Sequence, residues 1–67
     1  MQGITRAEAA AAIKAVIDFN GLKDERPTME RCRKISVFLG NFFMVYVTTL
    51  FVETVWKEYQ QEGKNND

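Results

Sequence analysis

ISVFLGNFFMVYVTTLFV, residues 35–52, is the stretch that decides the predicted fold, because it runs for eighteen residues without a charged side chain. Its mean hydropathy is about +1.9, which is typical of membrane-spanning helices, whereas the whole chain averages −0.25. An uncharged apolar run of roughly 18 residues or more can cross the hydrocarbon core of a bilayer as a helix. The stretch therefore predicts a membrane span at about residues 35–56, and the other residues become its flanks.

Length and composition narrow the class of protein. With 67 residues the chain is at most one domain, and a soluble chain of this length seldom buries enough surface to be stable alone. Cys32 is the only cysteine, so no disulfide can form within the chain. Histidine is absent, and the net charge is zero, which argues against nucleic acid as a partner. Lipid, a larger assembly or both are therefore expected to stabilise the chain.

A short amphipathic helix is predicted before the span. Thr5 and Glu8 have the spacing of a capping box, and the alanine-rich sequence AEAAAAIKAVIDF follows them. Asn20-Gly21 provides a stop, because glycine readily takes the left-handed conformation past a helix end. These signals predict a helix over residues 6–19.

The apolar face of this first helix is narrow and consists mostly of small residues. At helical spacing it comprises Ala9, Ala10, Ile13, Val16 and Ile17. Such a face favours packing against a partner protein, with binding to a membrane surface as the alternative. The helix and the polar linker LKDER (22–26) form an N-terminal unit, residues 1–26, on the inner side of the membrane.

A single long helix is predicted after this unit. Pro27 suits a first helical turn, and no stop signal follows until Gly63, so the helix covers residues 27–62 and is about 50 Å long. Residues 63–67 form a polar tail. A strand over residues 45–55 is the alternative, but a lone strand cannot satisfy its backbone in lipid. The predicted fold class is therefore all-α, a short N-terminal amphipathic helix plus one long, single-pass transmembrane helix.

Charges and aromatic residues on the two flanks predict the orientation of the span. Residues 1–34 hold seven basic and five acidic side chains, whereas residues 53–67 hold two basic and four acidic ones. Because basic flanks stay inside, the N-terminus is expected on the inner side. The expected anchors at the two membrane boundaries are Arg31, Arg33, Lys34, Trp56 and Tyr59.

The span has two different sides at 100° per residue. The side expected to pack against neighbouring helices carries small and polar residues, namely Ser36, Gly40, Asn41, Met44 and Thr48. The side expected to face lipid carries Phe38, Phe42, Tyr46 and Leu50. Asn41 is the most informative residue, because an amide in the middle of a span needs a hydrogen-bonding partner on another helix.

Motifs that carry chemistry are missing from the sequence. It contains no CxxC, HExxH, GxGxxG or GxxxxGK[ST] pattern, and no serine or cysteine has a histidine to act as its base. Cys32 lies among basic residues that could lower its pKa, but an inert thiol is expected. The sequence therefore predicts a protein that is not an enzyme and has no cofactor, no metal and no small-molecule substrate.

The predicted function is that of a small accessory subunit that braces and seals helices at the periphery of a multi-subunit membrane complex, with other membrane subunits and lipid as its partners. In outline, with one span and charged ends, the chain is similar to the supernumerary subunits of mitochondrial respiratory-chain complexes. That resemblance is one of architecture without a motif. It implies the mitochondrial inner membrane as the location.

Three alternatives stay open. The segment Pro27-Thr28-Met29-Glu30, between a surface helix and a span, resembles the hinge of the single-span subunit of the Sec protein translocon. Ser36 and Gly40 could instead support self-assembly of a holin-like small membrane protein. The last alternative is a soluble helical-hairpin oligomer in which the helix over residues 27–62 is buried in a four-helix bundle.

Overall fold

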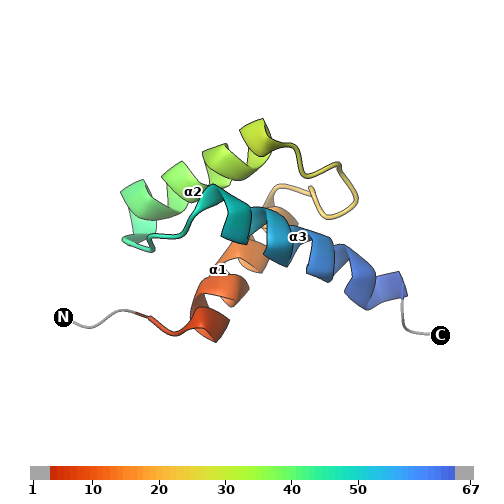
Figure 1. Ribbon diagram of the computed structural model, residues 1–67, viewed down its shortest axis with the longest axis horizontal. Helices are drawn as coiled ribbons and strands as arrows, with labels where there is room; N and C mark the ends of the chain where they lie inside the picture. The colour runs from red at the N-terminus through yellow and green to blue at the C-terminus, as the bar shows by residue number, and fades with distance from the viewer. Residues whose placement is uncertain (1–3, 65–67) are drawn as a thin grey trace.

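The apolar stretch 35–52 is not one helix, because it folds back on itself at residues 44–48 (Figure 1). A computed structural model describes residues 4–64, without the side chains of residues 63 and 64. It contains α1 (Arg6–Phe19), α2 (Met29–Phe43) and α3 (Thr49–Lys64). The chain is all-α, but the predicted long helix over residues 27–62 is wrong, since two helices and a turn take its place.

The break at residues 44–48 has a local cause. Met44 takes the left-handed conformation with φ 57°, and the N–H of Val45 donates to the carbonyl of Leu39 over 3.1 Å, which closes the end of α2. The β-branched residues that follow have low helix propensity. The Oγ1 of Thr48 then accepts a hydrogen bond from the N–H of Phe51 at 3.0 Å, so Thr48 caps the start of α3.

The predicted membrane span depended on the long helix and is wrong for the same reason. Across the described residues 4–64, no helix combines the length and the apolar character that a membrane span requires. The single-pass span, the inner-side orientation, the mitochondrial inner membrane and the role as an accessory subunit of a respiratory-chain complex are therefore wrong. The helical-hairpin alternative agrees better with the fold than the membrane prediction does, because the described helices pack on one another around a core (Figure 1). Its long helix over residues 27–62 is nevertheless replaced by α2 and α3.

The first helix begins and ends where its capping signals lie. Thr5 Oγ1 accepts from the N–H of Glu8 at 3.0 Å, and a carboxylate oxygen of Glu8 accepts from the N–H of Thr5 at 2.9 Å. At the other end Gly21 has φ 64°, a conformation that glycine takes without cost. The capping box and helix boundaries predicted for residues 6–19 are thus confirmed.

The hydrophobic core lies where α3 crosses the other two helices. Trp56 is fully buried and is the largest side chain in this core. The other core residues come from all three helices: Ile13, Ile17, Cys32, Ile35, Leu39, Val52 and Val55. Contacts between α1 and α2 are fewer than those that either helix makes with α3. The described part of the chain therefore has α3 as its central packing element.

Polar contacts fix α1 and the first connection onto α3. The indole N–H of Trp56 donates to the carbonyl of Lys23 at 3.3 Å, and Nε2 of Gln60 donates to the same carbonyl at 2.7 Å. The Tyr59 hydroxyl donates to the carboxylate of Asp18 at 2.7 Å. These bonds hold one end of the molecule together. At the chain end, the predicted polar tail at residues 63–67 is mostly outside the described residues, although α3 reaches Lys64.

Candidate protein-interaction surface

The residues predicted to pack against neighbouring helices lie on α2 and the turn after it. Ser36 Oγ donates to the carbonyl of Val47 at 2.7 Å, which ties α2 to the turn. Gly40 lies beneath the ring of Tyr46, because a Cβ atom at this glycine would meet that ring at 3.5 Å. Asn41, Met44 and Thr48 are exposed, so the structure does not bring the five residues into one contact.

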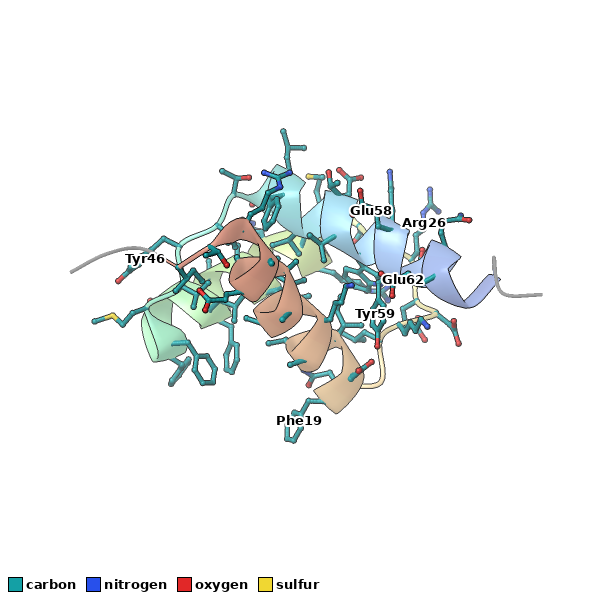
Figure 2. All side chains as sticks on the ribbon, turned by 90° about the horizontal axis from the view of Figure 1, so that it is seen from below. Phe19, Arg26, Tyr46, Glu58, Tyr59 and Glu62 are labelled. Atoms are coloured by element: carbon teal, nitrogen blue, oxygen red, sulfur yellow. The ribbon has the colours of Figure 1, made fainter. Side chains whose placement is uncertain are left out.

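The residues predicted to face lipid lie on the outside of the protein. Phe42 is 70% exposed and Tyr46 is 77% exposed, while Phe38 and Leu50 are exposed as well. Three more large apolar side chains of this region, Val37, Phe43 and Met44, are also exposed. We call these seven residues together the aromatic surface. Figure 2 shows Tyr46 pointing outward at one end of the molecule.

The residues predicted as membrane anchors separate into two groups. Arg31, Arg33 and Lys34 lie in the first half of α2, where Arg31 is half-buried and the other two are exposed. Arg31 Nη1 donates to the carbonyl of Arg26 at 2.7 Å. Trp56 lies in the core, and Tyr59 is half-buried against Asp18. The two aromatic anchors are thus parts of the folded interior and its edge.

The aromatic surface has an ordered centre. The rings of Phe38 and Phe42 have their centroids 5.0 Å apart, and those of Phe38 and Phe43 are 5.6 Å apart with an edge-on arrangement. Such pairs are favourable by about 0.5–1.5 kcal/mol beyond area burial. The three rings therefore hold one another in place although solvent reaches them.

Charge is absent from the aromatic surface and abundant beside it. From Ile35 to Val52 the sequence has no charged side chain. The neighbouring first turns of α2 carry Arg31, Arg33 and Lys34, against one carboxylate, Glu30, which lies 3.8 Å from the Lys34 ammonium. The surface is thus apolar at one end of α2 and basic at the other.

A groove continues the apolar character toward α1. It has a volume of about 680 Å³ and lies between the C-terminal half of α1 and the face of α2 that carries Phe38. Ala15, Val16 and Phe19 line it on the α1 side. Phe19 points away from the body of the molecule in Figure 2. The groove is open because α1 and α2 meet so little.

Two titratable side chains in the described part of the chain have a shifted pKa. Burial raises the pKa of the Cys32 thiol, and nearby Glu53 adds to that rise, so the nucleophilic thiolate is disfavoured. The hydrogen bond to Asp18 raises the pKa of Tyr59 above its ordinary 10.0. No group of three or more His, Cys, Asp or Glu side chains within residues 4–64 could hold a metal ion.

Sequence reasoning missed Val37 and Met44 as outward-facing residues. The signal that could have found them was the pair Thr48-Thr49, since threonine directly before an apolar helical repeat is a capping signal. With a helix start at Thr49, the apolar repeat of α3 becomes one buried face. The aromatic residues before Thr49 then have no place in that buried face and are expected to be exposed.

Comparison with protein-family models, with curated protein sequences and with solved structures gives no match. The aromatic surface is therefore interpreted from its own geometry.

Proposed function

We propose that this chain is a non-catalytic protein-interaction module that presents its aromatic surface to another polypeptide. The observation that carries the proposal is the number of large apolar side chains left exposed in one short uncharged stretch. Between Val37 and Leu50 seven such side chains are exposed, and the stretch holds no charged residue. Contiguous apolar patches on small proteins mark contact sites, because leaving them in water is unfavourable.

The backbone at Met44 supports this proposal. A left-handed conformation costs a non-glycine residue about 1–2 kcal/mol, and glycine would remove that cost. Met44 nevertheless has φ 57°, and its side chain is 71% exposed. Its sulfur accepts a hydrogen bond from the Tyr46 hydroxyl at 3.1 Å, which keeps both side chains on the aromatic surface. Strain of this kind tends to be kept where a side chain has a role outside the fold.

Methionine and aromatic side chains are also suited to binding proteins. Phenylalanine, tyrosine and methionine are enriched at protein interfaces, where their large area is buried at a low cost in conformational entropy. All three residue types occur on the aromatic surface.

A non-catalytic role is supported by the side chains that could take part in chemistry. The sequence has no histidine, and the thiol of Cys32 is buried with a raised pKa. The carboxylates that the structure ties to cations form surface pairs, such as Glu62 with Lys14 at 2.8 Å and Glu53 with Lys57 at 3.1 Å. Such pairs stabilise a fold modestly and are typical of solvated faces.

Site-specific photo-crosslinking tests the proposed function. A benzophenone amino acid is placed at Phe42 in cells that make the protein, and the matched control places it at the exposed Glu58 of α3, far from Tyr46 in Figure 2. A covalent protein adduct from position 42 and none from position 58 is expected. Equal adducts from both positions, or no protein adduct from position 42, would contradict the proposal.

A further inference from the structure

We propose that the groove between α1 and α2 binds a fatty acid, with the carboxylate at Arg31 and Lys34 and the alkyl chain toward Phe38 and Phe43. The groove has a volume of about 680 Å³, which is within the range of small-molecule sites in proteins. The ligand is held there without chemical change. This inference does not rest on the proposed function, although Phe38 and Phe43 also belong to the aromatic surface.

The walls of the groove are apolar along most of their length. Val16 of α1 and Leu22 after it are half-buried, and Ile35 of α2 is buried. Phe19 and Phe38 also line the groove, and their rings are exposed. A hydrocarbon chain that enters such a groove is favoured, because apolar surface of both the chain and the protein is removed from water.

The charged side chains that line the groove are two cations, Arg31 and Lys34, and among the described residues no carboxylate lines it. Arg31, Lys34, Ile35 and Phe38 share one side of α2, because the last three follow Arg31 by three, four and seven positions. The cations thus lie at one end of this side and Phe38 at the other. A ligand with an anionic head and an apolar tail complements both ends.

Both cations keep hydrogen-bond donors for an anion. Arg31 Nη1 donates to the carbonyl of Arg26 at 2.7 Å, which orients the guanidinium group. Arg31 Nη2 lies 3.8 Å from the carboxylate of Glu25, and the Lys34 ammonium lies 3.8 Å from that of Glu30. Both distances are too long for hydrogen bonds, so an incoming carboxylate can accept from the remaining N–H groups at shorter range.

Local charge and the length of the groove select a fatty carboxylate. Glu25 and Glu30 already offset part of the positive charge, so a single negative charge suits the head. A phosphate monoester carries about 1.5–2 negative charges at neutral pH, and its extra charge would be repelled by these two carboxylates. The lining of α2 extends from Arg31 to Phe43, about 18 Å at 1.5 Å per residue. An unbranched alkyl chain is long and narrow enough to follow it.

Titration of the isotope-labelled full chain with dodecanoate, followed by NMR below the critical micelle concentration, tests the site. We expect saturable shifts of the amide signals of residues 15–22 and 31–38, with one dodecanoate bound per chain. Dodecyltrimethylammonium has the same chain with a cationic head, and it should bind at least about tenfold more weakly because the two cations repel it. Octanoate, with a shorter chain, should also bind at least about tenfold more weakly, since each fully buried CH₂ is worth about fourfold in affinity.

Matched variants test the two ends of the groove separately. Lys34→Gln should weaken dodecanoate binding about threefold, and about tenfold when combined with Arg31→Gln, as for partly exposed ion pairs. Arg33→Gln removes an exposed cation of α2 that does not line the groove, and it should change the affinity by less than about twofold. Phe38→Ala should weaken binding about fivefold. Its control is Leu50→Ala, which removes an exposed side chain that does not line the groove and should have no such effect.

The outcomes separate this inference from the proposed function. The fatty-acid site is overturned if dodecanoate causes no saturable shift, if dodecyltrimethylammonium binds equally well, or if Lys34→Gln and Arg33→Gln weaken binding alike. Tighter binding of dodecyl phosphate than of dodecanoate overturns the carboxylate head. In each of these cases the proposed function still stands if the benzophenone at position 42 crosslinks to a protein. If dodecanoate binds as expected and position 42 gives no protein adduct, the fatty-acid site stands and the proposed function fails.

Discussion

Trp56 on α3 and Phe42 on α2 are both large aromatic side chains on helices of similar length, yet Trp56 is fully buried and Phe42 is 70% exposed. The difference comes from the spacing of apolar residues. On α3 they recur at Val52, Val55 and Trp56, so one face is apolar and the other polar. The second half of α2 is apolar on nearly every side, and only Leu39 of that half is buried. The fold thus leaves the aromatic residues in the second half of α2 exposed.

The largest loss of stability is expected when the buried aromatic residue of this pair, Trp56, is removed. Trp56→Ala should lower the free energy of unfolding by about 3–5 kcal/mol, as for other large-to-small changes at buried aromatic residues. It also removes the hydrogen bond from the indole to the carbonyl of Lys23. Urea titration followed by circular dichroism measures the change, and a large unfolded fraction in buffer is expected.

Phe42→Ala is the counterpart of that variant on the aromatic surface. It should change the free energy of unfolding by no more than about 0.5 kcal/mol, as for other surface substitutions. A loss as large as that of Trp56→Ala would mean that Phe42 belongs to the core, and the aromatic surface would lose its basis.

Substitutions in the two turns, after α1 and after α2, should change the free energy of unfolding by less than Trp56→Ala does. Gly21 and Met44 both have positive φ, and a Cβ atom at Gly21 would meet nothing within 4 Å. Gly21→Ala should therefore lower the free energy of unfolding by about 1 kcal/mol through backbone strain alone. Met44→Gly should raise it by up to about 1 kcal/mol, because it relieves strain and removes little buried area. Thermal unfolding of both variants measures whether stability decreases for Gly21→Ala and increases for Met44→Gly.

Met44→Gly carries a second consequence for the aromatic surface. If Met44 is kept for binding, the variant should be more stable and yet give less crosslinked protein from the benzophenone at position 42. A glycine variant that is less stable and gives an unchanged yield of crosslinked protein would show that Met44 serves the fold.

The smallest effect concerns the polar edge between α1 and α3. The hydrogen bond to Asp18, followed by burial and nearby carboxylates, raises the pKa of Tyr59 above 10.0. Because the raised pKa belongs to the folded state, the stability from this bond is complete below pH 10 and is lost as the pH rises through the folded pKa. In a Tyr46→Phe background, tyrosinate absorbance should titrate above pH 10, and Asp18→Asn should bring the midpoint back toward it. A midpoint that Asp18→Asn leaves unchanged would contradict the bond.

The first helix could be predicted from the sequence because its signals are local. Thr5 and Glu8 bond to each other's backbone, and Gly21 sits one residue past the C-cap Asn20. The end of α2 could not be predicted in this way. Its turn is carried by Met44, a residue with no preference for positive φ, and its next cap, Thr48, lies inside an apolar run. Hydropathy averaged over that run treats the turn and both helices as one segment.

The candidate surface was only partly predictable for the same reason. The pattern placed Phe38, Phe42, Tyr46 and Leu50 on one side of a helix and Ser36, Gly40, Asn41, Met44 and Thr48 on the other, but Asn41, Met44 and Thr48 are exposed as well, so the two sets are not separated in the structure. It assigned the first set to lipid because a continuous helix would have had no other use for these residues. Tertiary packing decided instead that Val52 and Trp56 fill a core and that α2 keeps its aromatic residues exposed.

The distance between two spin labels tests the central claim, the fold-back at residues 44–48, most directly. Labels at Lys34 and Lys57, in a Cys32→Ala background and diluted with unlabelled protein, report one distance within the chain. Packed antiparallel helices have axes 8–10 Å apart, so the labels should lie within about 25 Å. A distance of about 35 Å, the length of a continuous helix over 23 residues, would contradict the account, because α2 and α3 would then be one helix.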